Sequence, residues 1–118
     1  MEFSKKEIQP GVLVLGMTGS IRIGPNCQQI EQAVEDMIRR QETRVIFDLS
    51  GVSFIDSSGV GTIVRSLTKL RKLGGTLRLT GVQGMVEGIL KLTQIDKVIE
   101  IYPTASEALK DLPPLPNP

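Results

Sequence analysis

Residues 45–61 read VIFDLSGVSFIDSSGVG and pass from an apolar run into a polar segment spaced by glycines. The run Val45–Leu49 is short and nearly continuous in apolar residues, which is typical of a central strand covered on both faces. The segment Phe54–Gly61 then places a carboxylate and two hydroxyls directly before a helical pattern. The sequence therefore predicts a buried strand that leads into a helix, with polar side chains at the junction.

The segment Ser57–Leu73 has the apolar spacing of an amphipathic helix. Its predicted buried stripe consists of Val60, Ile63, Val64, Leu67 and Leu70. Gly74 stands where a helix commonly ends on a glycine. Three cations, Arg65, Lys69 and Lys72, recur at helical spacing, and we interpret them as a solvated face.

The rest of the chain alternates between strand and helix patterns. We expect a first hairpin around the run at 12–15 and a helix around 30–38. A strand is expected at 76–80, with one buried and one solvent-exposed face. A short helix is expected at 82–90, with Met85 in the core. A last strand is expected at 98–102, followed by a helix with Thr104 and Glu107 as a capping box that ends near Leu112. Helical crossovers join parallel strands, so these elements predict an α/β domain with a mixed sheet.

Length and composition narrow the class of protein. A chain of 118 residues forms one domain, which we place at 1–112, followed by a disordered proline-rich tail at 113–118. The chain has fourteen basic residues, thirteen acidic residues and 3% aromatic residues. It therefore lacks the positive patch and the stacking side chains that nucleic-acid binding requires. No run is long enough to cross a membrane and the start does not resemble a signal peptide, so we expect a cytoplasmic protein without membrane insertion.

The absence of histidine limits the chemistry available to this chain. Without histidine there is no Ser-His-Asp or Cys-His activation and no histidine metal ligand. Cys27 is the only cysteine, so the chain has no internal disulfide, and we interpret Cys27 as a small semi-buried side chain. Asp48 is interpreted as capping the following turn rather than as a base. We therefore expect no cofactor and no metal site.

Two interpretations apply to the segment Phe54–Gly61. Asp56, Ser57 or Ser58 can cap the helix, which is worth about 1 kcal/mol. Gly59 and Gly61 each cost roughly 0.5 to 1 kcal/mol within a helix, which points to close approach by another backbone or a ligand. A nucleotide loop fits poorly because the segment lacks the lysine-serine ending of a P-loop and the third glycine of a dinucleotide fingerprint. A phosphorylated serine at the helix start fits better, because a dianion is tolerated there.

The stretch DLSGVSFIDSSGVGTIVRSLTKLRKLGG, residues 48–75, resembles the central segment of STAS domains, the sulfate transporter and anti-sigma factor antagonist family. The resemblance extends over nearly the whole chain, and D-S-S-G-x-G is its specific part. It implies a mixed sheet with helices packed mainly on one face and a non-enzymatic role as an anti-sigma factor antagonist. In that scheme the unphosphorylated antagonist binds an anti-sigma factor that is a serine kinase, the kinase phosphorylates the serine after the aspartate, and a serine phosphatase reverses it.

On this sequence the resemblance assigns phosphorylation to Ser57, with Ser58 as the alternative. It assigns partner binding to the loop and helix start, comprising Arg22, Asp56, Ser57, Ser58, Gly59 and Gly61. Arg22 is a departure, because many family members carry an acidic residue at that place in the loop; a solvated loop cation is the alternative role for it. A non-phosphorylated STAS scaffold subunit of a signalling or transport complex is the alternative function.

Overall fold

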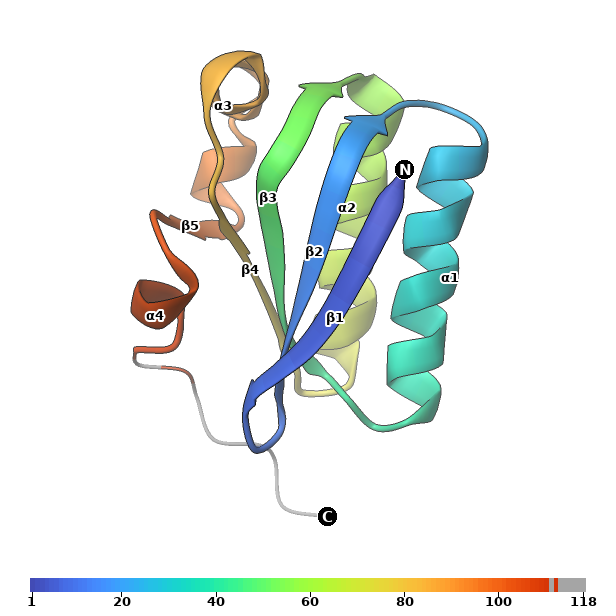
Figure 1. The fold of residues 1–118 in the computed structure, drawn as a ribbon, viewed down its shortest axis with the longest axis vertical. Helices are drawn as coiled ribbons and strands as arrows, with labels where there is room; N and C mark the ends of the chain where they lie inside the picture. Colours follow the sequence, from blue (N-terminus) through green and yellow to red (C-terminus); the bar gives the residue numbers. More distant parts are fainter. Residues whose placement is uncertain (111, 113–118) are drawn as a thin grey trace.

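The computed structural model describes residues 1–110 and 112 as a five-stranded sheet with helices (Figure 1). The elements, in chain order, are β1 (Glu2–Gln9), β2 (Val12–Ile21), α1 (Pro25–Arg39), β3 (Arg44–Ile55), α2 (Ser57–Lys72), β4 (Thr76–Thr80), α3 (Gly84–Leu92), the 3-10 turn η1 (Ile95–Lys97), β5 (Glu100–Tyr102) and α4 (Ala105–Ala108). The strands follow one another in the order β1-β2-β3-β4-β5. The tail predicted at 113–118 lies outside the described residues.

The sheet is mixed, as the sequence predicts. β1 and β2 form the expected antiparallel hairpin, while β2, β3, β4 and β5 pair in parallel. Parallel neighbours need a crossover connection, and α1, α2 and α3 supply it. The hairpin turns at Gly11, whose positive φ of 80° suits glycine.

Helices cover mainly one face of the sheet (Figure 1). α1 and α2 lie against it and bury the main core, to which α3 contributes Val86 and Leu90. The short α4 lies over the other face, where Ala108 packs with Val12 and Ile46 in a second, smaller cluster. The arrangement implied by the resemblance is therefore confirmed.

The central-strand prediction for Val45–Leu49 is confirmed, and β3 extends further, to Ile55. Side chains from both faces of this run are buried, because helices cover one face and α4 the other. Asp48 makes a local contact, since its Oδ1 accepts a hydrogen bond from the Ser50 amide at 3.0 Å, but the turn that it was expected to cap is absent, because β3 continues to Ile55. That contact lies where the register between β2 and β3 shifts.

The prediction that one face of β4 is exposed to solvent is wrong. Arg78 is 4% exposed and Thr80 is 2% exposed, although both alternate with the buried leucines of the strand. The reason is α4, a segment about 30 residues away in the chain, whose end supplies carbonyls to the guanidinium. Arg78 Nη1 donates to the Ala108 and Lys110 carbonyls, both at 2.8 Å.

The C-terminal elements are shorter than predicted. β5 has only three residues, because the amides of Val98 and Ile99 donate to the Ile95 carbonyl at η1. α4 ends at Ala108, four residues before Leu112, although its start is capped as expected, with the Glu107 amide donating to Thr104 Oγ1 at 3.2 Å. The helix predicted at 82–90 is confirmed as α3, but Met85 is 43% exposed and not part of the core, because it lies on the outer side of this helix.

Candidate functional site

The junction between β3 and α2 is built around Asp56. Its Oδ1 accepts a hydrogen bond from the Gly59 amide at 2.8 Å, which makes Asp56 the N-cap of α2. Its Oδ2 accepts from the Ile23 amide at 3.0 Å, in the loop between β2 and α1. Of the three capping candidates, the aspartate therefore serves the helix and also holds a second loop against it.

The surroundings of Asp56 favour its charged form. Hydrogen bonds from the Ile23 amide and then from the Gly59 amide lower the pKa of this carboxyl, and the Ser58 amide and the charge of Arg22 act in the same direction against a smaller effect of burial. The side chain is therefore a carboxylate at neutral pH. A fixed negative charge lies next to the two serines.

The two serines differ in exposure. Ser57 is exposed, and its hydroxyl makes no hydrogen bond to any residue that the structure describes. Ser58 is half-buried, and its carbonyl accepts the Thr62 hydroxyl at 3.0 Å. Because Asp56 already caps the helix, neither serine is needed for that purpose.

The two glycines of the segment also differ. A Cβ on Gly59 would lie 2.4 Å from the Ile21 carbonyl oxygen and 2.7 Å from Ile55 Cγ1, so this glycine is required for the close approach of α2 to the end of β2. A Cβ on Gly61 would meet only Arg65 Nη1, at 3.2 Å. Close approach by another backbone therefore explains Gly59. Packing within the fold does not explain Gly61.

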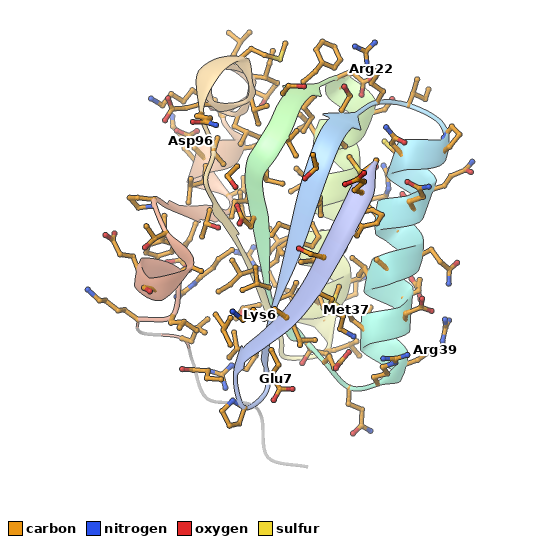
Figure 2. All side chains as sticks on the ribbon, in the orientation of Figure 1. Lys6, Glu7, Arg22, Met37, Arg39 and Asp96 are labelled. Carbon is orange, nitrogen blue, oxygen red and sulfur yellow. The ribbon has the colours of Figure 1, made fainter. Side chains whose placement is uncertain are left out.

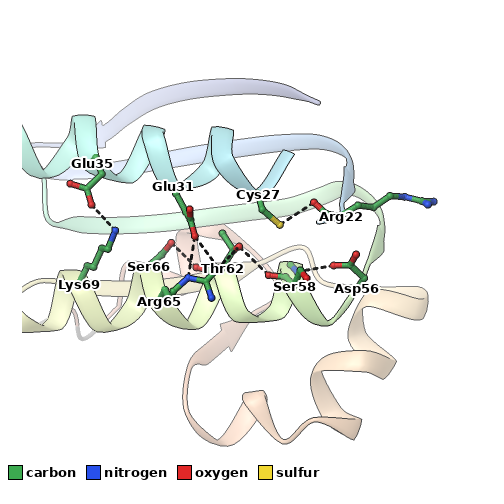
Figure 3. Close-up of polar contacts among 11 residues, drawn as sticks. Arg22, Cys27, Glu31, Glu35, Asp56, Ser58, Thr62, Arg65, Ser66 and Lys69 are labelled. Atoms are coloured by element: carbon green, nitrogen blue, oxygen red, sulfur yellow. Dashed lines mark hydrogen bonds and ion pairs between the residues drawn. The ribbon is translucent and has the colours of Figure 1, made fainter. Parts of the chain in front are cut away.

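The loop after β2 presents its side chains outward. Arg22 is exposed, and its Cζ lies 4.2 Å from the centre of the Phe54 ring. Figure 3 shows the Arg22 side chain pointing away from Asp56 and Ser58. The backbone of this loop is held from within, because Cys27 Sγ donates to the Arg22 carbonyl at 3.0 Å. Cys27 itself is buried, more fully than the semi-buried position expected for it.

Sequence reasoning missed two residues of this surface, Ile23 and Phe54. Ile23 is 74% exposed, beside Arg22, and Phe54 is half-buried under the guanidinium. The signal for Ile23 is an isolated apolar residue in a loop dominated by glycine, proline and polar residues. We call this region the candidate docking surface. It comprises the exposed Arg22, Ile23 and Ser57 and the half-buried Phe54, Asp56 and Gly61.

The cations of α2 are exposed, in agreement with their interpretation as a solvated face, and two of them also form ion pairs. Arg65 Nη2 lies 2.9 Å from Glu31 Oε1 and Lys69 Nζ lies 2.6 Å from Glu35 Oε1, so both pairs connect α2 to α1 (Figure 3). The hydrogen bond and charge of Lys69 lower the pKa of Glu35. These exposed pairs connect two helices, and the guanidinium of Arg65 lies next to Gly61, at the edge of the candidate docking surface.

Neither a metal cluster nor a membrane span is found within residues 1–110 and 112. No group of three or more histidine, cysteine, aspartate or glutamate residues there could hold a metal ion. No helix there is long and apolar enough to cross a membrane.

Comparisons with known proteins identify the family. The STAS domain model matches residues 4–108. The chain is 28% identical to an "Anti-sigma F factor antagonist" of Paenibacillus polymyxa, over 86% of this chain and 87% of the relative.

Solved structures give the same result. A Thermotoga maritima protein described as a "putative anti-sigma factor antagonist" is 31% identical, with a TM-score of 0.85 and 93% of each chain covered. The phosphorylated form of the Bacillus cell fate determinant SpoIIAA has the same fold, with a TM-score of 0.70, 20% identity and coverage of 92% of this chain and 96% of that one. Anti-sigma factor antagonists of this family are not enzymes, and neither is this protein. The chain therefore belongs to the STAS domain family and is an anti-sigma factor antagonist-like member of it.

Proposed function

We propose that this protein binds an anti-sigma factor with serine kinase activity, and that phosphorylation of Ser57 releases that partner. The observation that carries the proposal is that two neighbouring residues, Asp56 and Ser57, have different roles. Asp56 caps α2 and anchors the loop through two backbone amides, so the exposed Ser57 hydroxyl beside it is free to accept a phosphate.

A phosphate at Ser57 is compatible with the folded protein. Ser57 is the first residue of α2, where unpaired amides and the helix dipole favour negative charge. Because the side chain is exposed and its hydroxyl makes no hydrogen bond within the described part of the chain, modification leaves the cap intact. The phosphorylated protein therefore keeps its fold and changes only its surface.

The same phosphate opposes docking. It adds a charge of about −1.5 to −2 beside the Asp56 carboxylate. A partner that covers the apolar Ile23 and Phe54 would have to strip water from both negative groups at once. A kinase that docks here is therefore released by its own product, and a serine phosphatase restores the binding form.

Arg22 would contribute a positive contact to this interface. Stacking on Phe54 holds the guanidinium outward and limits the freedom that it loses on binding. Its planar donors suit a carboxylate of the partner. We propose Arg22, Asp56, Ser57 and Gly61 as contact residues, with Ser58 and the buried Gly59 shaping the helix start beneath them. Such a switch would operate in the bacterial cytoplasm.

The test combines binding with site mapping. The purified protein is incubated with the anti-sigma factor kinase of its host and ATP, and the modified residue is located by mass spectrometry. Ser57→Ala should abolish phosphate incorporation, and Ser58→Ala, as the matched control, should retain it. In a calorimetric titration Ser57→Asp should bind the kinase at least about tenfold more weakly than wild type, given like-charge repulsion in a desolvated contact.

Unchanged affinity of Ser57→Asp, or phosphate on Ser58 alone, would contradict the proposal. The scaffold alternative is favoured by one observation, the arginine at position 22 where the resemblance leads one to expect an acid. A stable complex that forms with the serine unmodified and is insensitive to Ser57→Asp would support the scaffold role.

A further inference from the structure

The outer edge of β1 is an open sheet edge. β1 is eight residues long, seven of them exposed, and it pairs with β2 alone among the described strands. At the opposite end of the sheet β5 has only three residues and runs into α4. An exposed edge of this length presents a row of backbone donors and acceptors that can pair with another strand.

The side chains of β1 alternate between two environments. Phe3, Lys5 and Glu7 lie opposite Met17, Leu15 and Leu13 of β2, which face the main core, and Lys5 Nζ contacts Glu42 Oε1 at 2.6 Å. Glu2, Ser4 and Lys6 lie opposite Thr18, Gly16 and Val14, on the face that α1 and α2 do not cover. Figure 2 shows Lys6 on β1, in the lower half of this strand.

We propose that the β1 edge pairs with β1 of a second copy of this chain, antiparallel, about a two-fold axis through Ser4. Such an axis stands perpendicular to the sheet and keeps the faces of the two copies aligned, so only residues on the same face come opposite each other. In this register Glu2 of each copy lies opposite Lys6 of the other, and Phe3 lies opposite Lys5.

Charge complementarity selects this register. Moving the axis to Lys5 or to Lys6 places that lysine opposite its own copy, and like charges directly opposite are destabilising. Centring on Ser4 produces two opposite-charge pairs on the open face and no like-charge pair. It also stays clear of the irregularity between Glu7 and Gln9, where the pairing with β2 changes register.

The resulting dimer is a continuous sheet of two copies joined mainly by backbone hydrogen bonds. The contact is narrow, so we expect a weak association that appears at high protein concentration. It uses no residue of the segment Asp56–Gly61. The proposal is therefore independent of the switch at Ser57 and can fail without affecting it.

The test is sedimentation equilibrium of the whole chain over a concentration series. Wild type should show a monomer-dimer equilibrium, and Glu2→Lys and Lys6→Glu should each raise its dissociation constant about tenfold, since either change makes both cross-strand pairs repulsive. An equimolar mixture of the two variants should associate as well as wild type, because every pair between them is attractive again.

The matched controls are Glu107→Lys and Lys110→Glu, the same charge changes on or beside α4, which should leave the dissociation constant unchanged. A wild type that stays monomeric throughout the series overturns the proposal. So does a mixture of Glu2→Lys and Lys6→Glu that associates no better than either variant alone. Circular dichroism of each variant establishes that the fold is retained.

Discussion

The start of α2 and the middle of β4 each use one charged side chain to serve two backbone groups. Asp56 accepts hydrogen bonds from two amides, of Gly59 and Ile23, close to the surface. Arg78 donates to two carbonyls, of Ala108 and Lys110, in the interior. One partner of Asp56 is three residues away, whereas both partners of Arg78 are 30 or more residues away. Both side chains connect distant segments, since Ile23 is 33 residues from Asp56, but only Asp56 also has a local partner.

Removal of Arg78 should have the largest effect. Arg78→Ala leaves two carbonyls without this donor and a cavity under α4, so we expect unfolding free energy to fall by about 3 kcal/mol. The measurement is urea denaturation. Arg71→Ala is the matched control, because Arg71 Nη2 donates to the Val98 carbonyl at an exposed position, at 3.0 Å. Arg71→Ala should lower the unfolding free energy by less than about 1 kcal/mol. Equal decreases for the two variants would contradict the expected difference between a buried and an exposed arginine.

Gly59 and Gly61 allow a comparison between a packed and an open position at the start of α2. Gly59→Ala brings a Cβ into the Ile21 carbonyl and should destabilise the fold by about 1 to 3 kcal/mol. Gly61→Ala meets only the movable end of Arg65 and should stabilise the helix by roughly 0.5 to 1 kcal/mol. Thermal unfolding of both variants under one condition measures the contrast. Two variants of equal stability would show that α2 does not approach β2 as described.

The smallest effect is expected at Asp56 itself. Asp56→Asn at neutral pH weakens the cap and should cost at most about 1 kcal/mol. The pKa of Asp56 is lowered in the folded protein, so its ionisation contributes stability that is fully present above the unfolded pKa of about 3.9 and is lost as pH falls through the folded pKa below it.

The variant should therefore lose stability less steeply than wild type when the pH is lowered below about 4. Urea midpoints collected across that range give the measurement. Asp96→Asn, at an exposed position in η1, serves as the control and should follow the wild-type profile. A profile for Asp56→Asn that is parallel to that of wild type would contradict a lowered pKa of Asp56 in the folded protein.

Much of the fold was predictable because its patterns are local. The run Val45–Leu49 predicted a doubly covered strand, and the stripe along Ser57–Leu73 predicted α2. The site was predictable in part, since the presence of Asp56 and Ser57 at a helix start is visible in the residues. Their separate roles could not be predicted, because aspartate and serine both favour the N-cap position. Only the contact with the Ile23 amide shows why Asp56, and not a serine, caps α2.

The sequence by itself determined the order of strands and helices, the absence of histidine chemistry and the polar helix start, since each depends on residue type and short-range spacing. Tertiary structure alone decided that Arg78 is buried, that Met85 is exposed, that Gly59 touches Ile21, that Ile23 is exposed and that Phe54 lies under Arg22. Each of these depends on which distant segment lies against the residue. Periodicity can tell which side chains share a face, but only packing shows what covers it.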